Sequence, residues 1–352
     1  MLDISVIMPT ARDDYPIIGM PSIHILEPTF HSLKTQTFKD FELIVIDALY
    51  PQKRDWIEAQ EWSFPVKYVP VHPNHRFWLD RGRWNVCGQL NTGILHAEGE
   101  LLLRIDDCSE FGEDFLQRFW DGYQIGYFPL AMHIKYLGGK PARFNKKYRK
   151  EGYEAQRPYL YQRLEPDRGE ILRQLFGEDG LIRDTRYRVV KASGGRMIAP
   201  INWYYGYSSA SLEALLKING YDELFDGDKS LEDADAGSRL TMAGYGGKFL
   251  LDVDHQVIEH EHNPIPKSLV TRETKPIKCN YAIYLINQRK RRWRANADNL
   301  TEEDLKFIVE ESLKPPCSPA TDFYEDDCQG DLFRLWASNQ LKFDLREERL
   351  EI

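Results

Sequence analysis

Four short apolar runs, separated by longer segments with helical spacing, fill the first 107 residues and constrain the fold more than any other feature. The runs are ISVIMPT (4–10), FELIVIDA (41–48), VKYVPV (66–71) and ELLLRIDD (100–107). Between them, residues 23–38 and 84–99 carry apolar side chains at helical spacing. Strands that alternate with helices in this way form parallel sheets with helices on their faces. The pattern therefore predicts an α/β fold with a mostly parallel central sheet.

Acidic side chains follow two of these expected strands at the point where each strand ends. Asp47 closes the second run, and the adjacent Asp106 and Asp107 close the fourth. Ligands of open parallel sheets bind beyond the carboxyl ends of the strands. Asp is also a common turn residue, so a single pair of this kind would indicate only a turn. Two strands of one sheet that are both closed by acidic residues favour a site for a positively charged ligand.

A basic insertion interrupts the chain at about residues 131–200. Within it, residues 140–196 contain 15 Lys and Arg against 8 Asp and Glu, although the whole chain has a net charge of −9. We expect a helix at 168–177 and a strand at 187–193 in this segment. A second basic run, RKRRWR, occupies residues 289–294. Either run can face an anionic acceptor, a phosphate-bearing donor or a membrane surface, or form a solvated face balanced by acids elsewhere.

The remaining sequence indicates a helical extension and an ordinary globular composition. From 264 to 352 the pattern is polar and helical, with a Pro- and acid-rich linker at 314–331 and a last amphipathic stretch at 332–341. The five cysteines are scattered and form no CxxC pair, so neither a disulfide framework nor a zinc ribbon is indicated. No apolar stretch approaches the ~18–20 residues that span a bilayer, and the amino end lacks the features of a signal peptide. We therefore expect a cytoplasmic protein without a transmembrane segment.

Six fragments resemble the family-two glycosyltransferases with the GT-A fold, in order and in spacing. They are ISVIMPTARD, SLKTQTFKDFELIVID, LNTGILHAEGELLLRIDD, GYDELF, LEDADAGSRL and HEH. The resemblance covers residues 3–263 and implies a GT-A-type, Rossmann-like domain over residues 1–263, followed by the helical extension. It also implies transfer of a sugar from a nucleotide-diphosphate donor, usually a UDP-sugar, to an acceptor hydroxyl with inversion, assisted by Mn²⁺ or Mg²⁺.

The resemblance assigns a divalent cation to the acids that follow the fourth strand. A departing nucleoside diphosphate needs a hard cation, which takes oxygen ligands. Asp107 is the expected metal ligand, with Asp106 on the metal or on the donor ribose. The family motif is Asp-x-Asp, whereas Cys108 occupies the third position here, so metal dependence stays open. His260 and His262 alternate on an extended segment, and the resemblance implies that one of them, preferably His260, is a further metal ligand; the alternative is a structural histidine.

The same resemblance places the general base in the segment LEDAD (231–235). An inverting transferase needs a carboxylate that takes the proton of the acceptor hydroxyl. Asp233 is the expected base, and Glu232 the residue that binds the acceptor or positions the base. Asp235 and Arg239, four residues apart, are expected to form a helical ion pair. Acids also favour a helix N-terminus, so the cluster is compatible with a helix start as well.

Nucleotide recognition is expected at the ends of the first strands. Asp47 can accept a hydrogen bond from a ring N–H, which suits uracil, and the Arg12 guanidinium can stack on a base or meet a phosphate. Phosphate contact is assigned to Arg83, with Arg81 as the alternative, and Asn91 is either a binding or a buried structural residue. The expected donor-binding residues are Thr10, Ala11, Arg12, Asp47, Arg83, Asn91 and Asp106.

Acceptor contacts are expected from the aromatic run NWYYGYSS (202–209). Trp203, Tyr204 and Tyr205 present flat faces suited to sugar rings, with core packing as the equal alternative. The basic stretches would suit a glycan, a lipid-linked or another anionic acceptor, with modified nucleic acid as a minor option. Two other functions remain open at this point. One is a nucleotidyltransferase of similar fold, although PTARDDYP lacks the glycine-rich loop of such enzymes. The other is a non-catalytic sugar-nucleotide or carbohydrate-binding protein. The sequence does not indicate an oligomeric state.

Overall fold

The computed structural model of the chain describes residues 2–11, 16–17, 20–136, 181–184, 186–227, 231–259, 280–295, 301–312 and 343–352. Its largest part is a five-stranded sheet with the strand order β11-β6-β1-β4-β5. The strands are β1 (Leu2–Thr10), β4 (Phe41–Asp47), β5 (Val66–Pro70), β6 (Gly99–Arg104) and β11 (Ser209–Ser211). All neighbours in this sheet pair in parallel except β11, which runs antiparallel to β6. The predicted mostly parallel sheet is confirmed.

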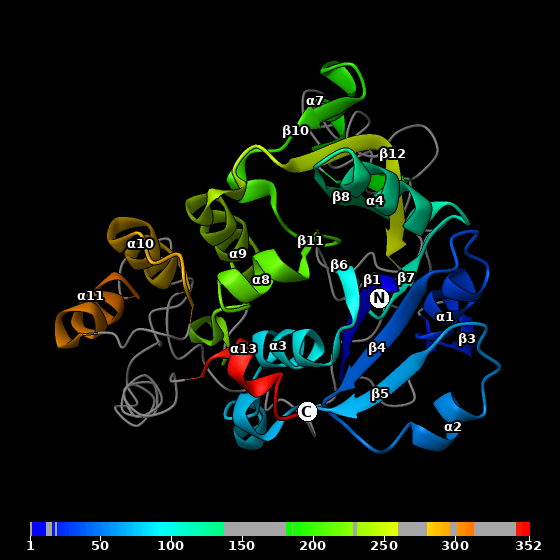
Figure 1. Ribbon diagram of the computed structural model, residues 1–352, viewed down its shortest axis with the longest axis horizontal. Coiled ribbons are helices and arrows are strands. Elements are labelled where there is room, and N and C mark those ends of the chain that lie inside the picture. Colours follow the sequence, from blue (N-terminus) through cyan, green and yellow to red (C-terminus); the bar gives the residue numbers. More distant parts are fainter. Residues whose placement is uncertain are drawn as a thin grey trace, which may run out of the picture.

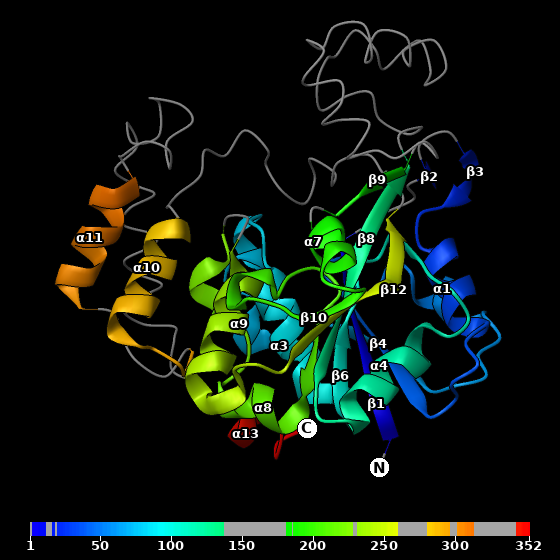
Figure 2. The ribbon, with the colours of Figure 1, turned by 90° about the horizontal axis from the view of Figure 1, so that it is seen from above.

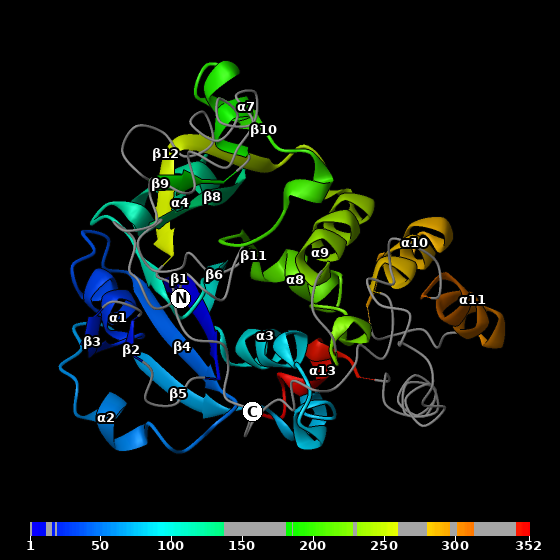
Figure 3. The ribbon, with the colours of Figure 1, turned by 180° about the vertical axis from the view of Figure 1, so that it is seen from behind.

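Both faces of this sheet are buried, as the uniformly apolar strands indicate. Along β4, Leu43 and Val45 point into one hydrophobic cluster while Ile44 and Ile46 point into the other. This alternation follows from the two-residue period of a strand. Figure 1 shows α3 (Val86–His96), α8 (Leu212–Lys217) and α9 (Glu232–Leu240) on one side of the sheet. On the other side lie α1 (Glu27–Lys34) and α2 (Arg54–Glu58), and Figure 3 shows the same division from behind.

The boundaries of the expected elements were close to those of the structure. The helix expected at 23–38 is α1, which begins at Glu27 because Pro28 is suited to the first turn. The helix expected at 84–99 ends earlier, at His96, and Gly99 already belongs to β6. A Cβ at Gly99 would lie 2.3 Å from the backbone nitrogen of Ser5, so close strand packing requires glycine there. The fourth expected strand, β6, ends at Arg104, two residues before Asp106, the first of the paired acids.

A second sheet has the order β10-β12-β8-β9, with β7 paired to β12. Its elements are β7 (Ser109–Glu110), β8 (Phe128–Tyr136), β9 (Leu181–Arg183), β10 (Arg196–Ile198) and β12 (Phe249–Glu259). The neighbouring helix α4 (Phe115–Gln124) packs against β8 and β12. Figure 2 shows β8 and β9 on the same side of the molecule as α7 (Arg186–Ala192).

The strand predicted at 187–193 was wrong, because this segment forms α7. Asp184 explains the difference, since its carboxylate accepts the backbone N–H of Arg186 at 2.9 Å, at the start of the helix. Among the residues of the helix, Val190 is buried while Val189 is 45 % exposed, so the two valines do not face one core in the manner of a buried strand. The helix expected at 168–177 lies outside the described residues, as do the linker at 314–331 and the stretch at 332–341.

The described parts of the extension are helical and pack against the first sheet's helices. They comprise α10 (Asn280–Lys290), α11 (Glu302–Ser312) and α13 (Leu345–Glu348), and Figure 2 shows α10 and α11 on the outer side of α9. Ile283, Ile286 and Leu345 belong to the same hydrophobic cluster as α3. The described helices contain none that is both long and apolar enough to span a membrane. The boundary at residue 263 stays a prediction, because the extension shares a core with the domain before it.

Candidate active site

The carboxyl end of β6 carries a charged sequence that begins inside the strand. Arg104 is the last residue of β6, and Asp106 and Asp107 follow in a turn. Asp107 is 5 % exposed, and its Oδ2 accepts a hydrogen bond from the Thr10 hydroxyl at 2.7 Å. Thr10 ends β1, the neighbouring strand. Two adjacent parallel strands therefore bring their last residues together at one edge of the sheet, as predicted.

The second set of acids stands at the N-terminus of α9. The guanidinium NH2 of Arg104 lies 3.5 Å from Glu232 Oε1, and its NH1 lies 3.8 Å from Asp233 Oδ2. The Gly206 N–H, 3.3 Å from Asp233 Oδ2, also faces this carboxylate. Gly206 has a φ of +68°, a left-handed conformation that glycine adopts at little cost. Arg104 thus joins the end of β6 to the acids of α9.

Arg104 and the neighbouring carboxylates shift one another's pKa values. Burial alone would lower the pKa of Arg104, but the carboxylates of Glu232, Asp106 and Asp233 outweigh it and raise the pKa, so the guanidinium stays charged. Burial and the neighbouring Asp233 raise the pKa of Glu232 above 4.5, against the opposing effect of Arg104. A carboxylate whose pKa rises toward neutrality is a better proton acceptor than an ordinary exposed one. Glu232 therefore has the electrostatic character of a proton-transfer residue.

The donor set at Asp106 and Asp107 fits a hard divalent cation. Both side chains offer only oxygen, the ligand type that Mg²⁺ and Mn²⁺ prefer. Among the residues the structure describes, no third histidine, cysteine or acid joins them in a compact ligand group. Such a cation would be held by one or two carboxylates together with phosphate oxygens, which is the usual arrangement for Mg²⁺. His260 and His262 lie outside the described residues, so their expected role as ligands stays a prediction.

Four of the expected donor-binding residues, other than Asp47, Asn91 and Asp106, come from two places in the chain. Thr10 and Ala11 lie at the end of β1, beside Asp107, where the prediction needs them. Arg83 is 9 % exposed and follows the end of a short 3₁₀ helix, Leu79–Arg81. Arg12 lies outside the described residues. The donor contacts of all four residues stay predictions.

Asp47 stands at the end of β4 as expected, but protein donors already surround its carboxylate. Oδ2 accepts hydrogen bonds from Lys53 Nζ at 2.9 Å and from the Tyr68 hydroxyl at 2.7 Å, and Oδ1 accepts the Leu49 N–H at 2.8 Å. Asp47 is only 1 % exposed. These bonds give Asp47 a structural role in the β4–α2 connection. Its contact with a uracil ring stays a prediction and would require one of these donors to move.

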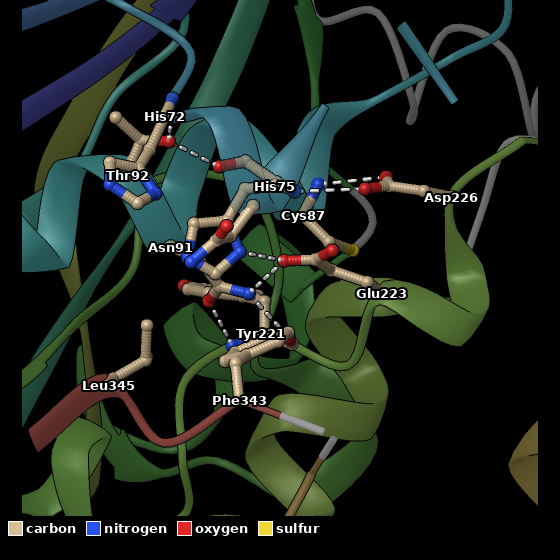
Figure 4. Close-up of polar contacts among 12 residues, drawn as sticks. His72, His75, Cys87, Asn91, Thr92, Tyr221, Glu223, Asp226, Phe343 and Leu345 are labelled. Atoms are coloured by element: carbon tan, nitrogen blue, oxygen red, sulfur yellow. Dashed lines mark hydrogen bonds and ion pairs between the residues drawn. The ribbon is translucent and has the colours of Figure 1, made fainter. Parts of the chain in front are cut away.

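Of the two roles that the sequence left open for Asn91, donor binding and buried structure, its surroundings support the structural one. Its side chain is completely buried in α3. The amide nitrogen donates to the Tyr221 carbonyl at 2.9 Å and to Glu223 Oε1 at 2.8 Å, and the amide oxygen accepts the Tyr221 N–H at 2.8 Å. These bonds attach α3 to the loop before α9, as Figure 4 shows. No surface of Asn91 is left for a ligand.

The aromatic run that was expected to bind the acceptor is only partly accessible. Tyr204 is 1 % exposed, and its ring centroid lies 4.8 Å from that of Phe249. For Tyr204 the core-packing alternative therefore applies rather than the acceptor contact. Tyr205 is half-buried, with the guanidinium of Arg186 3.8 Å from its ring centroid. Trp203 is also half-buried. The acceptor roles of Trp203 and Tyr205 stay predictions.

The basic run at 289–294 is largely paired within the protein. Lys290 forms an ion pair with Asp304, and Arg294 pairs with Asp344. Arg292 is 7 % exposed and donates to Asn287 Oδ1 at 2.7 Å. These contacts hold α10 against neighbouring segments. They favour the structural interpretation of this run over an anion-binding surface. The basic insertion between 137 and 180 lies outside the described residues.

Sequence reasoning missed Arg104, although its signal was present. An arginine inside the apolar run LLLRIDD departs from the strand pattern, and a buried charge must have partners. The prediction of a structural pair was correct for Asp235 and Arg239, which are both fully buried and joined at 2.6 Å across one helical turn. That pair anchors the helix that carries Glu232 and Asp233.

Comparisons with known proteins agree with this architecture. Residues 5–168 match the family model described as Glycosyl transferase family 2. A crystal structure of GalNAc-T7 with UDP, GalNAc and Mn²⁺ superposes with a TM-score of 0.52 at 13% identity, covering 96% of this chain and 55% of that one. The chain therefore spans about half the length of that protein. A crystal structure of S. aureus TarS 1-349 in complex with UDP-GlcNAc gives a TM-score of 0.47 at 14% identity, with 99% and 90% of the two chains covered.

No curated protein matches the chain in sequence. The family match covers the strands β1, β4, β5 and β6 and the acids at their ends, and so includes the first three of the six fragments that carried the resemblance in the sequence. The solved structure with the higher of the two TM-scores supports the same fold at low sequence identity. Residues 5–168 are thus similar to glycosyl transferase family 2, and the chain has a GT-A-like, mixed α/β fold with a largely parallel central sheet.

Proposed function

We propose that the chain is an inverting glycosyltransferase that moves a sugar from a UDP-sugar to an acceptor hydroxyl with the help of Mn²⁺ or Mg²⁺. The observation that carries this proposal is the position of Arg104, which brings the acids at the end of β6 and those of α9 around one guanidinium. The reaction needs both groups of acids close together. The acids after β6 would hold a cation that binds the leaving diphosphate, and the acids of α9 would activate the acceptor hydroxyl.

In this proposal Asp233 is the general base. Its side chain is 18% exposed, against 12% for Glu232, so it is the more accessible of the two acids. Asp233 takes the proton of the acceptor hydroxyl as the oxygen attacks the anomeric carbon from the face opposite the diphosphate. Glu232 and Arg104 position that carboxylate. Asp106 and Asp107 would hold the cation, which would supply charge neutralisation for the leaving group.

The donor assignment rests on the family match and on chemistry. The GalNAc-T7 crystal structure contains UDP and Mn²⁺, and its likeness to this chain supports the same class of donor here. The acceptor is proposed as an anionic or glycan hydroxyl, because residues 140–196 carry a strong positive excess. Lipid-linked glycans belong to this class, and modified nucleic acid remains its minor member. The described residues identify neither the transferred sugar nor the acceptor.

Donor hydrolysis tests the proposal without knowledge of the acceptor. A panel of UDP-sugars is incubated with the full chain and Mn²⁺, Mg²⁺ or a chelator, and the released UDP is measured. We expect UDP release from one or two donors with a cation, and loss of the release with chelator. Release of pyrophosphate from UTP and a sugar phosphate would instead identify a nucleotidyltransferase. Tight donor binding with no UDP release would point to a non-catalytic binding protein.

The base assignment has its own test. Asp233→Asn should reduce sugar transfer by roughly 10²–10⁴-fold while the affinity for UDP changes little, because the base acts on the acceptor rather than on the nucleotide. Asp254→Asn is the matched control, since Asp254 is an exposed acid of β12. Full turnover in Asp233→Asn, or an equal loss in the control, would remove Asp233 from the role of base.

A further inference from the structure

A second group of metal-binding side chains lies where the loop after β5 meets α13. His72, His75 and Glu348 each offer one ligand atom, and these atoms all lie within 4.8 Å of one another. His75 is completely buried and Glu348 is 8 % exposed, whereas His72 is half-buried. None of the three belongs to the candidate active site. Figure 4 shows the two histidines beside α3, with the chain leading into α13 below them.

We propose that His72, His75 and Glu348 bind a Zn²⁺ ion that fastens the segment 343–352 to the catalytic domain. This site is separate from the cation proposed at Asp106 and Asp107, and it does not depend on the proposed activity. Its function is structural, since its ligands come from two segments that lie 273 residues apart.

The orientation of His75 is the strongest argument for a metal. Its Nδ1 lies 2.6 Å from Glu223 Oε1, and its Nε2 lies 2.9 Å from Glu348 Oε2. Metal-bound histidines usually donate the N–H of the other ring nitrogen to a carboxylate, which fixes the tautomer and the ring. Glu223 supplies that carboxylate here, and Asn91 donates to the same oxygen at 2.8 Å. Glu223 thus holds the Nδ1 side of the ring, and this contact directs the other ring nitrogen, Nε2, toward Glu348.

The other two ligands are positioned in similar ways. Asn74 donates to Glu348 Oε1 at 2.6 Å, so one carboxylate oxygen is held by the protein while the other faces His75. The Nδ1 atom of His72 is buried and has no hydrogen-bond partner among the described residues. A buried nitrogen without a partner costs free energy, and coordination to a cation would remove that cost. The backbone of His72 is held by a bond from its N–H to the Thr92 hydroxyl at 3.0 Å.

The distances and ligand types select zinc over the harder cations. Zn–N and Zn–O bonds of ~2.1 Å in a tetrahedron place neighbouring ligand atoms ~3.4 Å apart. The three ligand atoms lie within 4.8 Å of one another, so the ligand atom of His72 would have to approach the others by at most ~1.4 Å. His75 Nε2 and Glu348 Oε2, which lie 2.9 Å apart, would have to separate by ~0.5 Å. Two imidazoles and one carboxylate suit Zn²⁺, whereas Mg²⁺ and Mn²⁺ prefer oxygen-only sets. A water molecule would complete the tetrahedron.

Metal titration of the full chain tests the site. The double variant Asp106→Ala/Asp107→Ala serves as the background, because it removes the other expected cation site. We expect it to bind an equimolar amount of Co²⁺ with the visible absorption of a tetrahedral complex, and Zn²⁺ to displace the Co²⁺. Adding His72→Gln should weaken Co²⁺ binding by at least roughly tenfold, and Glu223→Gln by about 10–100-fold. His96→Gln is the matched control, since His96 is a half-buried histidine of α3 outside the cluster.

Stability provides an independent measurement. Zn²⁺ alone should raise the melting temperature of the unsubstituted chain by mass action, but not that of His72→Gln or Glu348→Gln. His72 is half-buried, so its substitution should leave the fold intact, which circular dichroism verifies. The proposal is overturned if the Asp106→Ala/Asp107→Ala background binds no Co²⁺. It is equally overturned if His72→Gln and His96→Gln bind Co²⁺ alike.

Discussion

Arg104 and Glu232 lie 128 positions apart in the sequence, yet the NH2 of the Arg104 guanidinium is 3.5 Å from Glu232 Oε1. The two residues come from the end of a central strand and the first turn of a helix. Their contact brings the acids after β6 next to the acids of α9. The Nε and NH1 atoms of Arg104 are buried and make no hydrogen bond within the described residues, so the guanidinium keeps donors for a further partner.

Replacing Arg104 with methionine should damage catalysis more than donor binding. The change removes the positive charge that lowers the pKa of Glu232, so this pKa should rise further and the acidic limb of the rate profile should move to higher pH. We expect kcat/KM to fall by roughly 10²-fold, as when one preorganised donor is lost. Arg118→Met is the control, because Arg118 is an exposed arginine paired with Asp114. An unchanged pH profile would contradict the coupling of Arg104 to Glu232.

Asn91→Ala tests the structural role of this residue. The variant removes three buried hydrogen bonds, one to Glu223 and two to the Tyr221 backbone. The free energy of unfolding should fall by about 2–4 kcal/mol in a denaturant titration. The affinity of the folded fraction for UDP should not change, and the exposed Asn202 provides a control through Asn202→Ala. A specific loss of UDP affinity would restore Asn91 to the donor site.

Arg349 should stabilise the protein by binding the end of α3. Its guanidinium donates to the carbonyls of Leu95 at 3.0 Å and Ala97 at 2.8 Å, and it also contacts the carbonyl of Ile94. The last carbonyls of a helix have no partner within the helix. Arg349→Ala should therefore lower the free energy of unfolding by about 1–3 kcal/mol. The exposed Arg346 of α13 is the control, and equal effects of Arg346→Ala and Arg349→Ala would refute the prediction.

His255 should make the stability of the protein depend on pH. Burial, together with the nearby Arg118, lowers its pKa from 6.5 to about 4, and its ring packs against Phe115 and Phe119. The unfolded chain binds the proton of this histidine more readily than the folded protein does. The contribution of His255 to the free energy of unfolding is therefore fully present above pH 6.5 and is lost as the pH falls toward 4. A shift of this size corresponds to a loss of about 3 kcal/mol.

His255→Phe tests this dependence directly. The variant should show a smaller loss of unfolding free energy between pH 7 and pH 4 than the unsubstituted chain, measured by urea titration at each pH. The exposed His31 supplies the control variant His31→Gln, which should keep the full dependence. An identical pH dependence in His255→Phe would show that other groups are responsible.

Much of the fold could be predicted because its signals are local. The apolar strands and the helix after residue 84 follow from the period and length of the pattern, and the structure places them within a few residues. Prediction failed at 187–193, where two valines suggested a strand but a carboxylate two residues before Arg186 starts a helix. It left two roles open for Asn91 and for Tyr204, because their burial depends on segments distant in the chain. Nothing local distinguishes a buried amide from one that binds a ligand.

The sequence by itself determined the parallel sheet, the acids at the ends of its strands and the resemblance to family-two glycosyltransferases, because each is written in short contiguous motifs. Only the tertiary structure decided which charges meet. It placed Arg104 between the two acidic segments, surrounded Asp47 with Lys53 and Tyr68, and brought Glu348 to His75 across 273 residues. Such contacts depend on how helices pack across the sheet, and a charged side chain carries no local sign of the partner that burial will give it.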